Sequence, residues 1–262
     1  MTARRHIMIE FVGVLVAVTG LAVAAPDATG SSQEYSRQPS LDALKRAYVA
    51  VDRGDFEEAY GHFQNALENA STSTLRFQAQ VGLGSAASAL GRLDKSREHY
   101  EQALEIRPGS ADVLFSLGLV AKDQGRYQEA VSLFAKAAVR DVKMGEALVE
   151  LGVVYEILGL HTEAADACWR AVSVIPEDER ALLCLGVARY HLELYEGAAQ
   201  AFEAVIEHNP ESARAHYSLG LCRLYLEDRE GATAEFHVLK ELDPEMAKDL
   251  FSRINPPELL EP

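Results

Sequence analysis

Residues 111–118 read Ala-Asp-Val-Leu-Phe-Ser-Leu-Gly, and residues 125–137 read Gly-Arg-Tyr-Gln-Glu-Ala-Val-Ser-Leu-Phe-Ala-Lys-Ala. Apolar residues recur at helical spacing in the first part, at Val113, Leu114, Leu117 and Val120. Gly125 interrupts the pattern, and a second helical stripe follows at Tyr127, Ala130, Val131, Phe134 and Ala137. The stretch therefore predicts two antiparallel helices joined by a tight turn.

A leucine followed by glycine returns every 34 residues along the chain. The glycines are Gly84, Gly118, Gly152, Gly186 and Gly220. A fixed interval of this kind indicates that one structural unit is copied and stacked. Glycine inside a helix costs about 1 kcal/mol relative to alanine, so we expect each of these glycines where a neighbouring helix approaches the backbone closely.

These patterns resemble the tetratricopeptide repeat, whose two helices carry a leucine–glycine pair and an Ala-x-x-x-Phe motif, with proline before the next unit. The Ala-x-x-x-Phe motif begins at Ala59, Ala130, Ala198 and Ala232. Prolines close four units, at Pro108, Pro176, Pro210 and Pro244. The departures are Ser96 for the alanine of one unit, Cys168 for the aromatic of another and Val142 for one proline.

The resemblance implies an all-α fold, a right-handed α-solenoid of about six helix-turn-helix units with a short C-terminal capping helix. The units are expected at residues 40–76, 77–110, 111–144, 145–178, 179–212 and 213–246. The first is degenerate, because Ala47 replaces the glycine and the stretch Ser71–Thr74 lengthens its exit as a turn. Residues 247–262 are expected to hold the end of the capping helix and a tail.

The N-terminus has the layout of a secretory signal peptide. Arg4 and Arg5 precede an uncharged apolar run from 11 to 25, and Ala22-Val-Ala24 has the form that signal peptidase cleaves. We expect residues 1–24 to be removed. The alternative is an uncleaved anchor, because residues 7–25 approach the length of a spanning helix. Residues 25–39, rich in Ser, Gln, Gly and Pro, are expected to form a flexible linker. Both readings predict an exported protein of the bacterial periplasm or envelope.

The composition argues against several function classes. The formal net charge is −15, and an acidic surface repels phosphate backbones, so nucleic-acid binding is not expected. The eight histidines are scattered without metal-ligand spacing, and neither a phosphate-binding loop nor a nucleophile motif is present. We therefore expect no enzyme activity, no cofactor and no metal. The only membrane contact expected is through an uncleaved N-terminus.

Three cysteines, Cys168, Cys184 and Cys222, fall at apolar helical positions. An odd number without a Cys-x-x-Cys pair argues against a disulfide framework or a zinc site. Buried thiols are the simpler expectation. Cys168 and Cys184 lie in neighbouring predicted helices, however, so a bridge between them in an oxidising compartment stays open.

The resemblance also places a concave groove along the first helix of each unit. Its lining positions lie six and three residues before each repeat glycine, and one and four after it. The residues expected to contact a partner are Phe115, Leu119, Val149, Val153, Arg180, Leu183, Val187, Tyr190, Arg214, Tyr217, Leu221 and Leu224. The expected groove is apolar, with Arg180 and Arg214 as a basic rim. Apolar residues stand where chaperone-binding relatives carry the polar clamp for a C-terminal carboxylate, so that ligand is not expected.

These features predict a non-enzymatic scaffold that holds an amphipathic helix or an apolar segment of a partner protein during assembly of an envelope complex. Three alternatives stay open. The groove side chains could simply pack against one another or against the tail. The chain could self-assemble into a homo-oligomer. It could also be an accessory subunit that positions a catalytic partner.

Overall fold

The computed structural model describes residues 39–256. The expected signal peptide or anchor, most of the expected linker and the tail after Pro256 lie outside these residues. Everything regular between 39 and 256 is helix, with no strand in that range. None of the helices in this range combines the length and the hydropathy that a membrane crossing requires.

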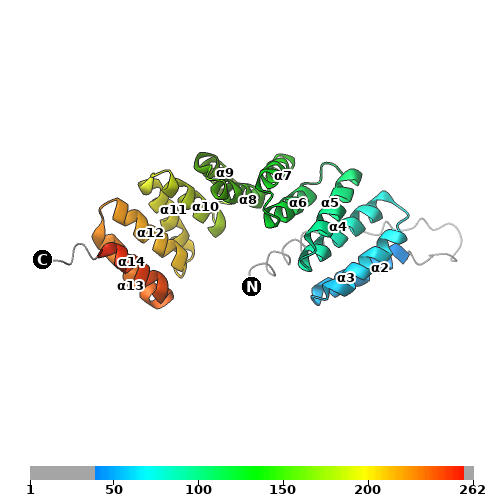
Figure 1. Ribbon diagram of the computed structural model, residues 1–262, viewed down its shortest axis with the longest axis horizontal. Helices are drawn as coiled ribbons and strands as arrows, with labels where there is room; N and C mark the ends of the chain where they lie inside the picture. The colour runs from blue at the N-terminus through cyan, green and yellow to red at the C-terminus, as the bar shows by residue number, and fades with distance from the viewer. Residues whose placement is uncertain (1–38, 257–262) are drawn as a thin grey trace, which may run out of the picture. The chain divides into compact units, whose positions relative to one another are not determined.

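The chain divides into two compact units, at residues 1–133 and 134–262. In the first unit, successive helices pack on one another in chain order (Figure 1). They are α2 (Pro39–Asp52), α3 (Phe56–Glu68), α4 (Ser73–Ala89), α5 (Leu93–Ile106) and α6 (Ala111–Asp123). Helix α7 (Tyr127–Arg140) crosses the division.

The second unit continues the same arrangement of helices packed on their chain neighbours. It contains α8 (Gly145–Ile157), α9 (His161–Val174), α10 (Glu179–His191), α11 (Tyr195–His208), α12 (Ala213–Tyr225), α13 (Arg229–Leu242) and α14 (Pro244–Ile254). The first helix of one pair also contacts the first helix of the next, as α8 contacts α10 and α10 contacts α12. The all-α solenoid predicted from the repeat is confirmed.

Two of the repeat glycines, Gly84 and Gly186, make room for an aromatic ring from the second helix of their own pair. A Cβ atom on Gly84 would lie 2.7 Å from the ring of Tyr100, and one on Gly186 would lie 2.5 Å from the ring of Phe202. Both rings are almost fully buried. The close neighbour of the glycine backbone is therefore an aromatic ring rather than a second backbone.

The start of α4 differs from the expected turn at Ser71–Thr74. The Thr72 side chain accepts a hydrogen bond from the backbone N–H of Leu75 at 3.2 Å and so caps the helix. Ser73 and Thr74 form the first turn of a 17-residue helix. The predicted turn therefore covers Ser71 and Thr72 but not Ser73 and Thr74, because a polar stretch that begins a helix through capping resembles a loop when only composition is considered.

Helix α14 closes the C-terminal end of the array. Asp243 caps it by accepting hydrogen bonds from the N–H groups of Glu245 and Met246, and Pro244 occupies the first turn, where its missing N–H costs nothing. Leu250 is fully buried, and a Cβ atom on Gly220 would lie 2.6 Å from its Cδ2 atom. The helix therefore covers the glycine of the last pair.

Candidate functional site

Three successive first helices, α8, α10 and α12, line one pocket in the second unit. Its volume is about 230 Å³. Six of the predicted groove residues lie together in it: Val149, Val153, Arg180, Leu183, Val187 and Arg214. Glu156, Ile157 and Cys184 complete the lining. The 34-residue register thus brings residues from three separate repeats to one site.

The floor of this pocket is apolar and its sides are partly open. Val149 is 1% exposed and Leu183 is 9% exposed, so both support the floor more than they present surface. Val153 and Val187 are half-buried, and Ile157 is 50% exposed. A ligand side chain entering here would meet the branched ends of valine and isoleucine residues.

The two arginines of the pocket differ in whether they form an ion pair. Arg180 donates a hydrogen bond to Glu150, whose carboxylate is buried in α8. Arg214 has no ion-pair partner among residues 39–256. The expected basic rim therefore reduces to one arginine that is committed to the fold and one whose charge is available to a ligand.

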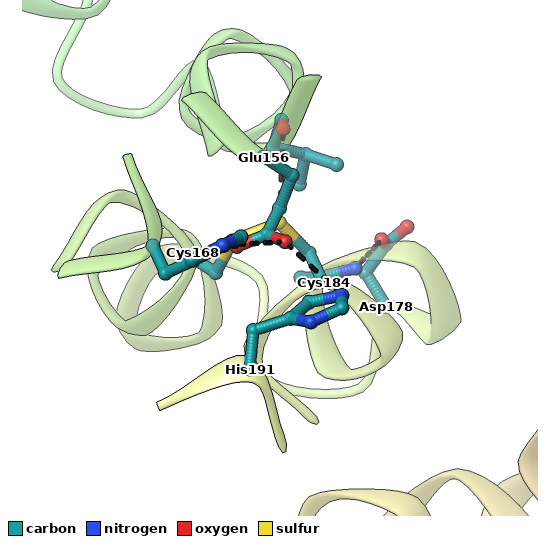
Figure 2. Close-up of a disulfide and its surroundings, with 8 residues drawn as sticks. Glu156, Cys168, Asp178, Cys184 and His191 are labelled. Atoms are coloured by element: carbon teal, nitrogen blue, oxygen red, sulfur yellow. Dashed lines mark hydrogen bonds and ion pairs between the residues drawn. A yellow bond between two sulfur atoms is a disulfide. The ribbon is translucent and has the colours of Figure 1, made fainter. Parts of the chain in front are cut away.

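A small polar cluster lies at another edge of the pocket, around Glu156 of α8 (Figure 2). One oxygen of this carboxylate lies 3.1 Å from His161 Nδ1 and 3.7 Å from His191 Nε2. The two imidazole rings stack with their centroids 4.7 Å apart. The pocket consequently has a carboxylate with histidine partners on one side and a free arginine on another.

A disulfide lies beneath the pocket. Cys168 of α9 and Cys184 of α10 are bonded, with their Cα atoms 5.6 Å apart (Figure 2). This Cα distance suits a disulfide. The expectation of three buried thiols was wrong for this pair, since helix stacking brings together two residues 16 positions apart. Cys222 is a buried free thiol, and burial raises its pKa to about 12.

The apolar residues predicted for the sixth repeat do not extend the pocket. Tyr217, Leu221 and Leu224 pack against the buried cluster that α13 and α14 share. The Tyr217 hydroxyl donates a hydrogen bond to Asp249 of α14, which lowers the pKa of that carboxyl. The capping helix α14 thus packs against these predicted groove residues.

Tyr190 belongs to an aromatic cluster next to the pocket rather than to its lining. Its ring meets those of Tyr195 and Tyr225 edge-on, with both centroid distances 5.7 Å. Burial, followed by a hydrogen bond with Tyr225, raises the pKa of Tyr190 well above its usual range. The phenol therefore stays neutral at physiological pH.

The remaining predicted residues, Phe115 and Leu119, are half-buried on α6 in the first unit. Across residues 39–256, no group of three His, Cys, Asp or Glu side chains is placed to hold a metal ion. The pocket of α8, α10 and α12 is therefore the candidate site, and its chemistry is apolar contact plus charge pairing.

Sequence signals for the unpredicted members of the site were weak. Glu150 looks like one more polar residue in an apolar helix, and His161 and His191 are 30 residues apart in sequence. Only the packing of α8 against α9 and α10 brings these groups together. The equivalent residues of the adjacent repeats are Ser116 and Cys184, so a carboxylate at position 150 was the one available hint.

Comparisons with known proteins agree with this architecture. Family models of the tetratricopeptide repeat match residues 40–109, 75–138, 115–179 and 183–247. Among curated proteins, RNA polymerase-associated protein CTR9 of Caenorhabditis elegans is 26% identical over 100 residues, which are 37% of this chain and 8% of CTR9. Photosystem I assembly protein Ycf3 of Prochlorococcus marinus is 28% identical over 98 residues, 35% of this chain and 57% of Ycf3. The matches thus span less than two thirds of either relative.

Solved structures show the same helix arrangement. A crystal structure of MamA has a TM-score of 0.59 at 26% identity and covers 63% of this chain and 97% of MamA. The crystal structure of YrrB, described as a tetratricopeptide repeat protein with an unusual peptide-binding site, has a TM-score of 0.62 at 25% identity. It covers 71% of this chain and 96% of YrrB. Because the family models match well over half of its residues, this chain belongs to the tetratricopeptide repeat family.

Proposed function

We propose that this protein is a non-enzymatic scaffold that binds a segment of a partner polypeptide in the pocket of α8, α10 and α12. Proteins of this family typically mediate protein–protein contacts and complex assembly, and the matches to YrrB and Ycf3 fit that role. The observation that carries the proposal is the pocket itself. It combines an apolar floor drawn from three repeats with the unpaired guanidinium of Arg214.

The chemistry of the pocket selects a particular kind of partner segment. The valine and leucine lining suits one or two apolar anchors, each contributing roughly 1.5–3 kcal/mol when buried, before ordering costs. Arg214 suits a carboxylate placed next to the anchor, since guanidinium and carboxylate groups can form two parallel hydrogen bonds. The partner we propose is therefore a short amphipathic helix or extended segment with an apolar anchor beside an Asp or Glu.

Selection of displayed random peptides on the purified protein tests this proposal without a known partner. We expect enrichment of sequences that combine an apolar residue with a neighbouring acid. Arg214→Glu should lower the affinity of the selected peptides by about tenfold or more, in line with loss of a charged hydrogen bond. Arg170→Glu is the matched control, because Arg170 is an exposed arginine of α9 outside the pocket lining. Peptides that bind Arg214→Glu as tightly as the parent protein would refute the assignment.

We further propose that the protein acts outside the cytoplasm, in the periplasm or at the inner-membrane surface. The support is the signal-like sequence of residues 1–24 together with a disulfide, because disulfides persist mainly in oxidising compartments. Mass spectrometry of the protein from its native host should find an N-terminus at Ala25 if the segment is cleaved. Recovery of the intact chain with the cytosolic fraction would contradict export.

Self-association through the C-terminal end is the second candidate. Phe236 and Phe251 lie with ring centroids 5.2 Å apart, and Phe251 is 50% exposed. They line a pocket of about 320 Å³ together with Lys240 and Lys248. The acidic, leucine-containing tail after Pro257 has complementary chemistry. If it links copies, deleting residues 257–262 should lower the mass measured by light scattering. An unchanged mass would remove the tail from consideration.

A further inference from the structure

The disulfide and the pocket are physically continuous. Cys184 lines the pocket, and its sulfur is bonded to Cys168 of α9. Both sulfur atoms lie over the backbone of α8, because a Cβ atom on Gly152 would be 2.4 Å from Cys168 Sγ and 2.7 Å from Cys184 Sγ. One bond therefore holds α9 and α10 together against α8, and two of these three helices line the pocket.

The disulfide occupies the space that an aromatic ring fills in other repeats. Tyr100 covers Gly84 and Phe202 covers Gly186, whereas the two sulfurs cover Gly152. Cys168 stands at the position of those rings, as the small residue that replaces the aromatic of the family motif. The fourth helix pair consequently has a disulfide where the second and fifth pairs have an aromatic ring.

Reduction of the Cys168–Cys184 bond would force the two sulfur atoms apart. Bonded sulfurs lie about 2.05 Å apart, whereas non-bonded heavy atoms separate to about 3.5–4 Å. The backbone of Gly152 blocks movement toward α8. The two thiols can then separate if α9 or α10 shifts or if one cysteine side chain rotates, and a shift of α10 or a turn of Cys184 toward the pocket changes the floor on which a ligand side chain rests.

We propose that the Cys168–Cys184 disulfide is a redox switch for the pocket, which binds its partner segment in the oxidised form and loses affinity when the bond is reduced. This inference rests on the proposed function. The reductant is a dithiol. Its thiolate attacks Cys184 Sγ from the pocket, the S–S bond breaks, and Cys168 leaves as a thiolate that takes up a proton. The second thiol of the reductant, as its thiolate, then attacks the reductant's own sulfur in the mixed disulfide. This forms a disulfide within the reductant and releases Cys184 as a thiolate that takes up a proton, so that two electrons pass from the dithiol to the protein.

Access favours this direction of attack. Cys168 is fully buried, whereas Cys184 is slightly exposed and lines the pocket. The third cysteine does not compete, because burial keeps the Cys222 thiol protonated at physiological pH. A segment bound in the pocket would cover Cys184, so binding and oxidation would support each other by linkage.

The first experiment measures access with full-length protein and no partner. Reduction by dithiothreitol is followed by trapping free thiols with iodoacetamide and by mass spectrometry. Val187→Trp, which fills the pocket, should slow reduction by about fivefold or more, since thiol–disulfide exchange requires access to the attacked sulfur. Val238→Trp is the control, an exposed valine of α13 outside the pocket lining. Equal rates in the two variants would overturn attack through the pocket.

The second experiment measures the effect of reduction on the pocket helices by amide hydrogen exchange. Reduced protein should exchange about tenfold faster over α8 and α10 than oxidised protein, because the local cross-link is lost. Cys222→Ser should behave as the parent. Cys168→Phe/Cys184→Ala restores a ring over Gly152 and should make exchange independent of dithiothreitol. If that variant does not fold, Cys168→Ser/Cys184→Ser must reproduce the exchange of the reduced parent.

Unchanged exchange over α8 and α10 after complete reduction would overturn the switch. That result would leave the proposed function standing, since peptide selection and its loss in Arg214→Glu test the pocket independently. Conversely, if no peptide is selected but exchange responds to reduction, the proposed function fails while the disulfide keeps its role in holding the helices. If the pocket binds peptides and the disulfide controls it, the selected peptides should bind the oxidised protein about tenfold more tightly than the reduced one.

Discussion

At the scale of single residues, the repeat glycines leave space for a neighbouring side chain. The steric cost of filling that space can be measured separately from the helix propensity of the new residue. Gly186→Ala places a Cβ atom 2.5 Å from the Phe202 ring in a fully buried site. Overpacking of this kind typically costs about 1–3 kcal/mol, which exceeds the roughly 1 kcal/mol that alanine gains over glycine in a helix. We expect a lower free energy of unfolding for this variant in urea titrations.

Gly61→Ala is the matched control for this substitution. Gly61 lies on the exposed side of α3, and a Cβ atom there would have nothing within 4 Å. Only the propensity gain remains, so this variant should be more stable than the parent by about 0.5–1 kcal/mol. If both alanine variants change stability in the same direction, steric contact with the ring is not what selects glycine at the repeat position.

Tyr48 supports a prediction about alkaline stability. Its hydroxyl is buried without a hydrogen-bond partner among the described residues, and burial raises the pKa of Tyr48 to about 12. Between pH 10 and 12 the unfolded chain therefore loses this proton before the folded protein does, and stability falls as the pH rises. Tyr48→Phe should be about as stable as the parent or about 1 kcal/mol more stable at pH 7, because it removes an unsatisfied polar group.

Thermal unfolding at pH 7 and pH 11 measures this effect. The difference in melting temperature between the two pH values should be smaller for Tyr48→Phe than for the parent. The ring itself is retained, so its edge-on contact with Phe63, at a centroid distance of 5.4 Å, acts as an internal control for packing. An equal alkaline loss in both proteins would show that Tyr48 does not contribute to it.

The sequence predicted the pocket residues that depend only on register. Val149, Val153, Leu183 and Val187 occupy equivalent positions in successive repeats, so a constant period places them together. It left the Cys168–Cys184 bond open, and it did not predict the Glu150–Arg180 pair or the two histidines at Glu156. Those contacts depend on how the side of one helix pair meets the next, and a period contains no information about that packing.

At the scale of elements, the capping helix α14 stabilises the end of the array. Leu250 is fully buried in the cluster that α14 shares with α12 and α13, and it lies over Gly220. Leu250→Ala should therefore lower the free energy of unfolding by about 2–5 kcal/mol. Phe251→Ser is the neighbouring control, because Phe251 is half exposed and should cost far less. Similar losses from the two substitutions would contradict the assigned burial.

The same element explains why the pocket does not continue along the predicted groove positions of the sixth repeat. Extrapolating the register treats Tyr217, Leu221 and Leu224 as equivalent to the groove positions of earlier repeats. In those repeats the next pair leaves part of the surface free, whereas at the end of the array α14 packs where a seventh unit would begin. The first and last elements of a solenoid meet different neighbours from the rest, so a repeat register describes them least well.

At the scale of the whole chain, the free energy of unfolding is expected to be a sum of contributions from each helix pair and from its contacts with the adjacent pairs. Within each compact unit, the helices of residues 39–256 that pack closely are neighbours or next neighbours in sequence. The fold class was predictable for this reason, because a period and two helical stripes are enough to specify contacts between near neighbours. Such contacts also limit how far a perturbation spreads along the chain.

Amide hydrogen exchange on Leu250→Ala tests this locality. The substitution removes contacts of α14 with α12 and α13, so exchange should become faster in these three helices by about tenfold or more. Exchange in α2, α3 and α4 should match the parent, since these helices belong to the first compact unit and the substituted cluster belongs to the second. The parallel experiment with Leu44→Ala, a buried residue of α2, should give the opposite distribution. Uniformly faster exchange in both variants would mean that the array unfolds as one cooperative unit, and the nearest-neighbour description of this protein would then be wrong.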